Sequence, residues 1–216
     1  TPHRRILFAG AAFGLLSMYE LQANNFTQFQ LTRPSRARGG SNPFDSVAVL
    51  LDGTVFVTGG APSRAFNSAS NAALLYDVAG AEPVMVPNIP GLTCYRNSHT
   101  STTLPDGKVL LYGGNAGGDM TEGTEIFDPA TRTFQVEPST PNRASHTATL
   151  LLDGSVLITG GSVQIDYTGE QRRVLDTAVV YSPARLIPAA QIHTAPGANP
   201  SQGAILHAGT TRVVTG

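Results

Sequence analysis

A sixteen-residue pattern occurs three times in this chain and ends each time in a pair of glycines. The copies are DSVAVLLDGTVFVTGG at 45–60, HTSTTLPDGKVLLYGG at 99–114 and HTATLLLDGSVLITGG at 146–161. Gly60 and Gly114 are 54 residues apart, and Gly114 and Gly161 are 47 residues apart. Units of this length that consist of strand, tight turn and strand predict a tandem array of small β-sheets.

Each copy has the pattern of a β-hairpin. Asp-Gly stands between two runs of strand-forming residues, and glycine allows the positive φ that such a turn requires. The second run of each copy is apolar at consecutive positions, as in KVLLYGG at 108–114. Consecutive apolar residues indicate a strand buried on both faces, so we expect each sheet to lie between two neighbouring sheets.

Each repeat predicts four antiparallel strands. The first two form the hairpin, and a loop of variable length follows at 61–72, 115–123 and 162–175. The third strands are expected at 73–77, 124–128 and 177–181, and the outer strands at 24–29, 82–87 and 132–137. The segment 2–23 has the basic start and apolar middle of a secretory signal, but RILFAG (5–10) matches SVLITG (155–160), which favours a repeat over 4–31 without its first strand.

The domain organisation follows from where the repeat ends. Residues 182–202 hold four prolines without periodicity and are predicted to be a linker, whereas 203–216 again has strand character. We therefore expect a repeat array over 1–187, followed over 188–216 by a proline-rich linker and the start of a further β segment.

Composition excludes several classes of function. Only 13% of the residues are charged and the net charge is −1, which argues against a nucleic-acid-binding protein. No stretch has the roughly 18–20 apolar residues that a membrane span needs, so no membrane insertion is expected. The single cysteine, Cys94, forms no internal disulfide, so cysteine usage does not reveal the compartment, and its simplest interpretation is a small buried side chain.

The repeats resemble a known family. The pattern R-x-x-H-[ST]-x-x-x-L-x-DG-x-V-L-x-x-GG, followed by [EV]-x-[FY]-D-P-x-T-x-x-F, resembles kelch repeats of the bacterial kind related to the central domain of galactose oxidase. The resemblance implies an all-β propeller with four-stranded antiparallel blades, either about four blades or a fragment of a larger propeller. Phe29 and Phe134 replace the tryptophan of the outer strand, and Asp45 replaces the repeat histidine. Residues 199–216 are similar to the opening of a β-rich domain of secreted bacterial proteins, which implies an extracellular or cell-surface location.

Two Arg-His pairs occur at the same position of successive repeats, Arg96 with His99 and Arg143 with His146. Histidines near a central channel could bind a metal or act as general bases. Recurrence favours the alternative, in which these residues hydrogen-bond neighbouring strands, because catalytic groups need not repeat in every unit. The same structural role is expected for the glycine pairs, which are Gly59, Gly60, Gly113, Gly114, Gly160 and Gly161.

Loops on a stiff β scaffold are the expected place for binding. The loop residues that are candidates for ligand contact are Arg64, Asn115, Asp119, Glu122, Asp166 and Arg172. The acids Asp119, Glu122 and Glu125 could together bind Ca²⁺, but their spacing does not match an EF-hand, which favours solvated carboxylates. No metal, no cofactor and no catalytic residue is predicted.

The sequence therefore predicts a non-catalytic binding or structural module that contacts a protein or carbohydrate. Self-association through open blade faces is a further expectation. The alternative is a fragment of a galactose-oxidase-like copper radical oxidase. Oxidases of that kind use a Tyr-His ligand pair, which is absent here, and a cysteine cross-linked to a tyrosine of another loop, whereas Cys94 and Tyr95 are adjacent.

Overall fold

The regular secondary structure of the residues that the structure describes is all β. The structure is a computed structural model, and it describes residues 5–10, 15–20, 24–30, 45–60, 69–80, 82–116, 119–120, 123–137, 142–165, 171–183 and 185–187. These ranges contain strands and turns and no helix, so the described part has no helix that could cross a membrane. The all-β class predicted from the sequence is confirmed.

The strands form three four-stranded antiparallel sheets and a three-stranded one. The N-terminal sheet consists of β1 (Arg5–Gly10), β2 (Leu15–Glu20) and β3 (Asn25–Gln30). Sheet 1 consists of β4 (Ser46–Val49), β5 (Val55–Thr58), β6 (Ala73–Asp77) and β7 (Val84–Val86). Sheet 2 consists of β8 (Thr100–Thr103), β9 (Val109–Tyr112), β12 (Thr124–Asp128) and β13 (Thr133–Glu137). Sheet 3 consists of β14 (Thr147–Leu150), β15 (Val156–Thr159), β18 (Ala178–Ser182) and β19 (Arg185–Ile187).

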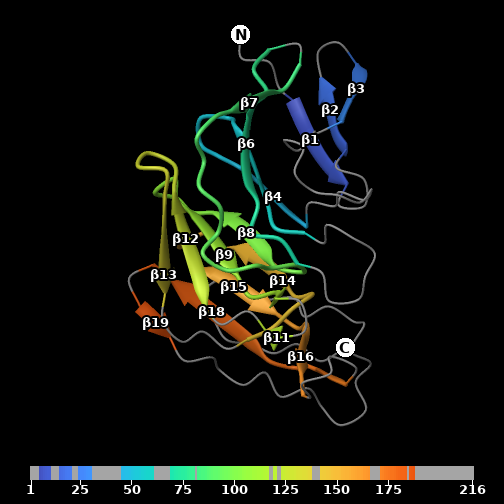
Figure 1. Cartoon of the computed structure of the whole chain (residues 1–216). Helices are drawn as coiled ribbons and strands as arrows, with labels where there is room; N and C mark the ends of the chain where they lie inside the picture. Colours follow the sequence, from blue (N-terminus) through green and yellow to red (C-terminus); the bar gives the residue numbers. More distant parts are fainter. Residues whose placement is uncertain are drawn as a thin grey trace.

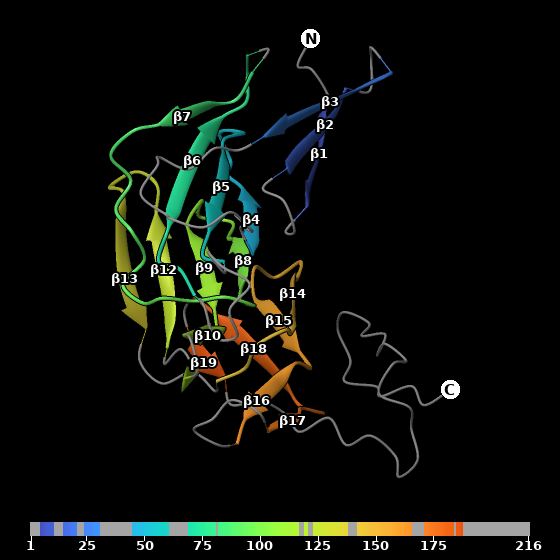
Figure 2. The same ribbon diagram turned by 45° about the vertical axis from the view of Figure 1, so that its right-hand side comes forward.

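The sheets follow one another in chain order, with β1–β3 at one end and sheet 3 at the other (Figures 1 and 2). The first strands are neighbours across the sheets, because β4 contacts β8 and β8 contacts β14. Within the described residues the sheets do not close into a ring.

Equivalent sequence positions have equivalent pairing. In sheet 2 Thr100 pairs with Tyr112, and in sheet 3 Thr147 pairs with Thr159, so both partners are displaced by the same 47 residues. The Asp-Gly turns are also alike: Gly53, Gly107 and Gly154 have φ of 88°, 88° and 83°. Each turn is closed by its aspartate, which accepts the backbone N–H two residues on, at 2.9–3.1 Å.

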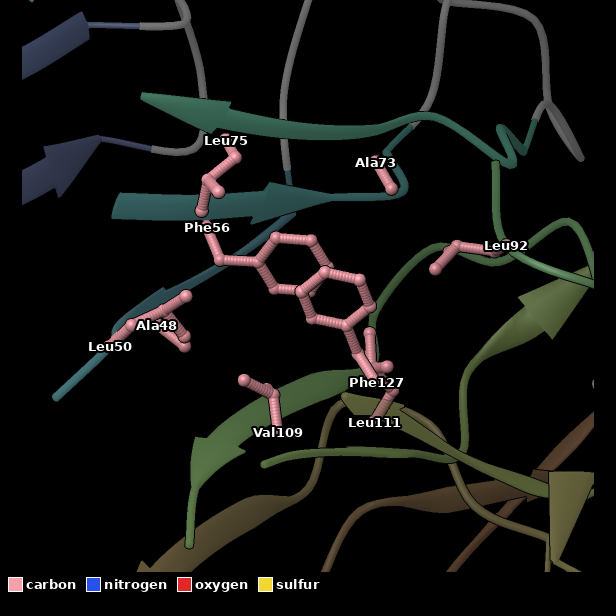
Figure 3. Packing of buried hydrophobic residues seen from close by; sticks show 9 residues of the cluster. All are labelled: Ala48, Leu50, Phe56, Ala73, Leu75, Leu92, Val109, Leu111 and Phe127. Atoms are coloured by element: carbon pink, nitrogen blue, oxygen red, sulfur yellow. The ribbon is translucent and has the colours of Figure 1, made fainter. Parts of the chain in front are cut away.

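The apolar core lies between the sheets rather than within any one of them. Phe56 of β5 and Phe127 of β12 stack between sheets 1 and 2, with ring centroids 4.3 Å apart and planes 6° from parallel (Figure 3). A second buried cluster joins sheets 2 and 3 through Leu110, Tyr112 and Ile158. Strand β9 of sheet 2 is therefore buried on both faces, as the consecutive apolar residues of 108–114 predicted.

Two details of the sequence prediction are wrong. The proposed linker 182–202 begins with a strand, because Arg185–Ile187 pairs with β18 beyond a tight turn at Pro183. Two of the predicted loops contain short hairpins, β10 (Asn115–Ala116) with β11 (Asp119–Met120) and β16 (Ser162–Gln164) with β17 (Arg172–Val174). A strand of two or three residues is too short to show an alternating apolar pattern in the sequence. Such a strand is defined by its pairing with a neighbouring strand. The predicted segment 188–216, with its resemblance over 199–216, lies outside the described residues.

Candidate functional site

Arg96 is completely buried and connects three parts of sheet 2. It stands just before β8, and one terminal nitrogen donates to the Gly113 carbonyl at 2.8 Å. The other forms an ion pair with Glu125 Oε1 of β12 at 2.5 Å. Glu125 also accepts the backbone N–H of Thr93 at 2.8 Å and that of Cys94 at 3.4 Å. Glu125 lies in the strand predicted at 124–128, and solvated carboxylates are not what is found there, because pairing with Leu111 of β9 turns its side chain into the interior, where it is 1% exposed.

Arg143 has the same place in sheet 3 but a different set of partners. It donates to the carbonyls of Gly160 and Thr177 at 2.8 and 3.0 Å, and to Thr177 Oγ1 at 3.2 Å. Val179 holds the strand position that Glu125 has in sheet 2, and no carboxylate of the described residues pairs with Arg143. Burial accordingly lowers the pKa of Arg143.

The two repeat histidines bridge neighbouring sheets. His99 Nε2 lies 2.8 Å from Thr58 Oγ1 of sheet 1, and His146 Nε2 lies 2.9 Å from Thr100 Oγ1 of sheet 2. Burial, with a further contribution from the positive charge of Arg96, holds the pKa of His99 well below its ordinary value. Burial, aided by Arg143, lowers the pKa of His146 to about 4. Both rings are therefore neutral at physiological pH and act as hydrogen-bonding links between sheets.

In sheet 1, Asp45 occupies the repeat position that the histidines occupy in sheets 2 and 3. Unlike the histidines, which contact the preceding sheet, Asp45 contacts the segment that leads into the next one. Its Oδ2 accepts the backbone N–H of Ser98 at 2.6 Å. Burial raises the pKa of Asp45, and the hydrogen bond from Ser98 works in the opposite direction. Within the described ranges, no three or more His, Cys, Asp or Glu side chains are grouped so as to hold a metal ion.

The glycine pairs allow one sheet to approach the backbone of the next. The Gly60 N–H donates to the Arg96 carbonyl at 3.1 Å, and the Gly114 N–H donates to the Arg143 carbonyl at 2.9 Å. A Cβ on Gly59 would lie 2.6 Å from the Arg96 carbonyl oxygen, and one on Gly113 would collide with that of Arg143. The repeated Arg-x-x-His and Gly-Gly positions thus meet at each contact between successive sheets.

Alanine at Gly113 should destabilise the protein more than alanine at Gly160. Both residues have the same backbone conformation, with φ of 65° and 64°, so both variants lose about 1 kcal/mol to left-handed strain. Only Gly113 faces a neighbouring carbonyl, and the extra collision should bring its cost to about 2 kcal/mol or more. Urea denaturation of the two variants measures the difference, and equal losses would contradict close packing at Gly113.

The two short hairpins form a surface separate from these interior contacts. Both follow a glycine pair and precede the third strand of a sheet, and β11 lies beside β16 (Figure 1). Around β16 and β17, exposed aliphatic and cationic side chains occur together. We call this the rim surface, and its members are Ile165, Gln171, Arg172, Arg173 and Val174. Ile165 is 57% exposed and Val174 70%.

The sequence-predicted loop residues fall in different places. Arg172 lies on the rim surface, whereas Asn115 is buried in β10, with its side chain 3.4 Å from that of Asn97. Asp119 belongs to β11, and Arg64, Glu122 and Asp166 lie outside the described residues. Ile165 and Val174 were missed, although aliphatic residues on both sides of a polar loop were a visible signal in 162–175.

Cys94 and Tyr95 lie in the segment that approaches β8, away from the rim surface. The Cys94 thiol is free and half-buried, and the Tyr95 side chain is 59% exposed. The thiol accepts a long hydrogen bond from Thr93 Oγ1 at 3.7 Å.

Comparison with known protein families and curated proteins identifies no relative of this chain. No protein-family model matches the sequence, and a search of curated proteins finds no similar chain. The structure itself defines a class: an all-β repeat protein in which antiparallel four-stranded sheets follow one another face to face.

Proposed function

We propose that this chain is a kelch-type β-propeller segment that serves as a non-catalytic binding or structural module of a secreted or cell-surface bacterial protein. Three sheets with four strands each, in the order of the chain, are the arrangement that propeller blades have. The shared R-x-x-H, Asp-Gly and Gly-Gly positions support the kelch type.

The internal contacts of the repeat support a role without catalysis. The Arg96 guanidinium is engaged by Gly113 and Glu125, and each histidine is engaged by a threonine of the preceding sheet. A general base or a metal ligand needs a face open to substrate or ion, and these rings are 4% and 7% exposed.

The rim surface supports binding of a macromolecular partner. Arg172 and Val174 lie on one face of the hairpin, and Arg173 and Ile165 on the other, so each face offers a planar cation that pairs with carboxylates beside exposed apolar area. The binding proposal depends on a single observation, which is that exposed apolar and arginine side chains occur on one small hairpin. The aliphatic character favours a protein over a glycan, because sugars prefer flat aromatic platforms.

Peptide binding tests this proposal. The full chain, immobilised, is screened against a displayed peptide library and a glycan array, and a selected binder is measured against Arg172→Ala. We expect an acidic, apolar peptide and about tenfold weaker binding by the variant, which corresponds to about 1.4 kcal/mol.

Lys108→Ala is the control, because Lys108 is a half-exposed cation on sheet 2 that lies 3.9 Å from Asp128. Equal binding by both variants, or no selectable binder, would contradict a binding role for the rim surface. Copper uptake with release of hydrogen peroxide from alcohols would instead support the oxidase alternative.

A further inference from the structure

Sheets 1 and 2 each pack one face against the next sheet along the chain. Sheet 3 has an equivalent face, and none of the described sheets covers it. We call it the open face. It is made of Thr147, Leu151, Leu152, Leu157, Thr159, Gly160 and Gly161. Their counterparts in sheets 1 and 2 show what each position contacts when a further sheet is present.

The apolar positions of the open face lack their usual cover. Leu50 and Leu104 are 4% and 2% exposed because the next sheet packs on them, whereas the equivalent Leu151 is half-exposed. The turn residue that follows differs less. Leu51 and Pro105 are exposed, but they lie 3.3 and 3.2 Å from where a Cβ on Gly107 and Gly154 of the next turn would stand, whereas the equivalent Leu152 is 99% exposed.

The polar positions also lack their usual partners. Gly60 and Gly114 donate to the arginine carbonyl of the next sheet, and no described residue accepts the N–H of Gly161. The Gly59 and Gly113 positions lie against that same carbonyl, whereas a Cβ on Gly160 would meet no described atom within 4 Å. Thr100 bonds the histidine of the next sheet, but the equivalent Thr147 bonds Thr159 of its own sheet at 2.8 Å.

We propose that the open face docks a further four-stranded sheet of the same repeat, which has Arg-x-x-His before its first strand and an Asp-Gly turn. The histidine of that sheet bonds Thr147, and the carbonyl of its arginine accepts the Gly161 N–H. The glycine of its turn lies against Leu152. Both existing contacts supply the geometry of the carbonyl and turn-glycine interactions. The histidine bond to Thr147 follows the contact between sheets 2 and 3, since in the contact between sheets 1 and 2 His99 bonds Thr58, the counterpart of Thr159.

A second copy of this chain does not fit as the occupant. Arg-x-x-His occurs only at 96–99 and 143–146 in the whole sequence. Both of these sheets already use that face, since His99 is bonded to Thr58 and His146 to Thr100. Sheet 1 offers Asp45 in place of the histidine. Neither Arg-x-x-His of this sequence is therefore free to serve a second copy as the partner.

An extended chain tests the proposal. A duplicate of residues 138–187 is inserted directly after Ile187 of the full chain, and amide hydrogen exchange is followed at Gly161 of the original repeat. We expect exchange at Gly161 to slow at least tenfold, toward the protection of Gly60 and Gly114. Gly160→Ala in the original repeat should lower the urea midpoint at least twice as much in the extended chain as in the natural one.

The matched control carries Arg143→Ala and His146→Ala in the inserted copy only, and it should show neither effect. Unchanged exchange and an unchanged Gly160→Ala effect in a folded extended chain would overturn the proposal. The natural chain gives an independent readout if the extension does not fold. Its Gly161 amide should exchange much faster than those of Gly60 and Gly114, and equal protection would overturn the proposal. A dimer of the natural chain that Leu152→Asp dissociates would also overturn it, in favour of a second copy.

Discussion

Replacing Glu125 with leucine should destabilise the protein by about 3–5 kcal/mol, one of the two largest effects we expect. The substitution leaves the guanidinium of Arg96 completely buried without its carboxylate. The backbone N–H groups of Thr93 and Cys94 lose their acceptor at the same time. Urea denaturation monitored by circular dichroism measures the loss.

The double variant Arg96→Met with Glu125→Leu separates the buried charge from the packing of the strand. Removing both charges should restore a large part of the lost stability, because a buried ion pair can be replaced by apolar residues of similar volume. Val179→Leu changes the equivalent position of sheet 3, where no ion pair exists, and should cost about 1 kcal/mol. If the single and double variants at sheet 2 were equally unstable, the ion pair would not be the source of the effect.

Lowering the pH from 7.5 to 4 should remove about 3 kcal/mol of stability through His146 alone. Its pKa is about 4 in the folded protein and near 6.5 in the unfolded chain, so the unfolded chain binds more protons between these values. The contribution is complete above about pH 6.5 and decreases as the pH falls toward 4. His99, whose pKa is also depressed, adds to the loss in the same direction. Asp45 opposes it, because its pKa is raised in the folded state.

Urea midpoints measured at several pH values test this expectation. His146→Asn should lower stability at pH 7.5, because it weakens the link to Thr100. It should also reduce the dependence of the urea midpoint on pH between pH 6.5 and 4. The matching substitution at His99 should flatten it as well. A slope unchanged in both variants would mean that these histidines are not buried and neutral.

The parts of the fold that the sequence predicts are those that recur along it. The match of 99–114 with 146–161 predicts the shared register, and the Asp-Gly dipeptides predict the turns, because both depend on local residues. β19 was missed because it is defined by pairing with β18, and the small hairpins were missed for the same reason.

The candidate site was predictable only in part. Recurrence of Arg and His indicated an internal role, but their partners lie far along the chain or in another sheet. Glu125 illustrates the difficulty, since the strand at 124–128 was predicted but the sequence does not show that this carboxylate faces Arg96. Arg172 was recognisable as a surface cation, whereas its neighbours Ile165 and Val174 become notable only once their exposure is known.

The central claim is that successive repeats are joined at equivalent positions, glycine pair against arginine carbonyl. Scalar couplings across hydrogen bonds, measured by nuclear magnetic resonance on the labelled chain, observe these contacts directly. We predict one coupling from the Gly60 amide to the Arg96 carbonyl and another from the Gly114 amide to the Arg143 carbonyl. Absence of both from a folded sample, or coupling of either amide to a carbonyl of its own sheet, would contradict the account.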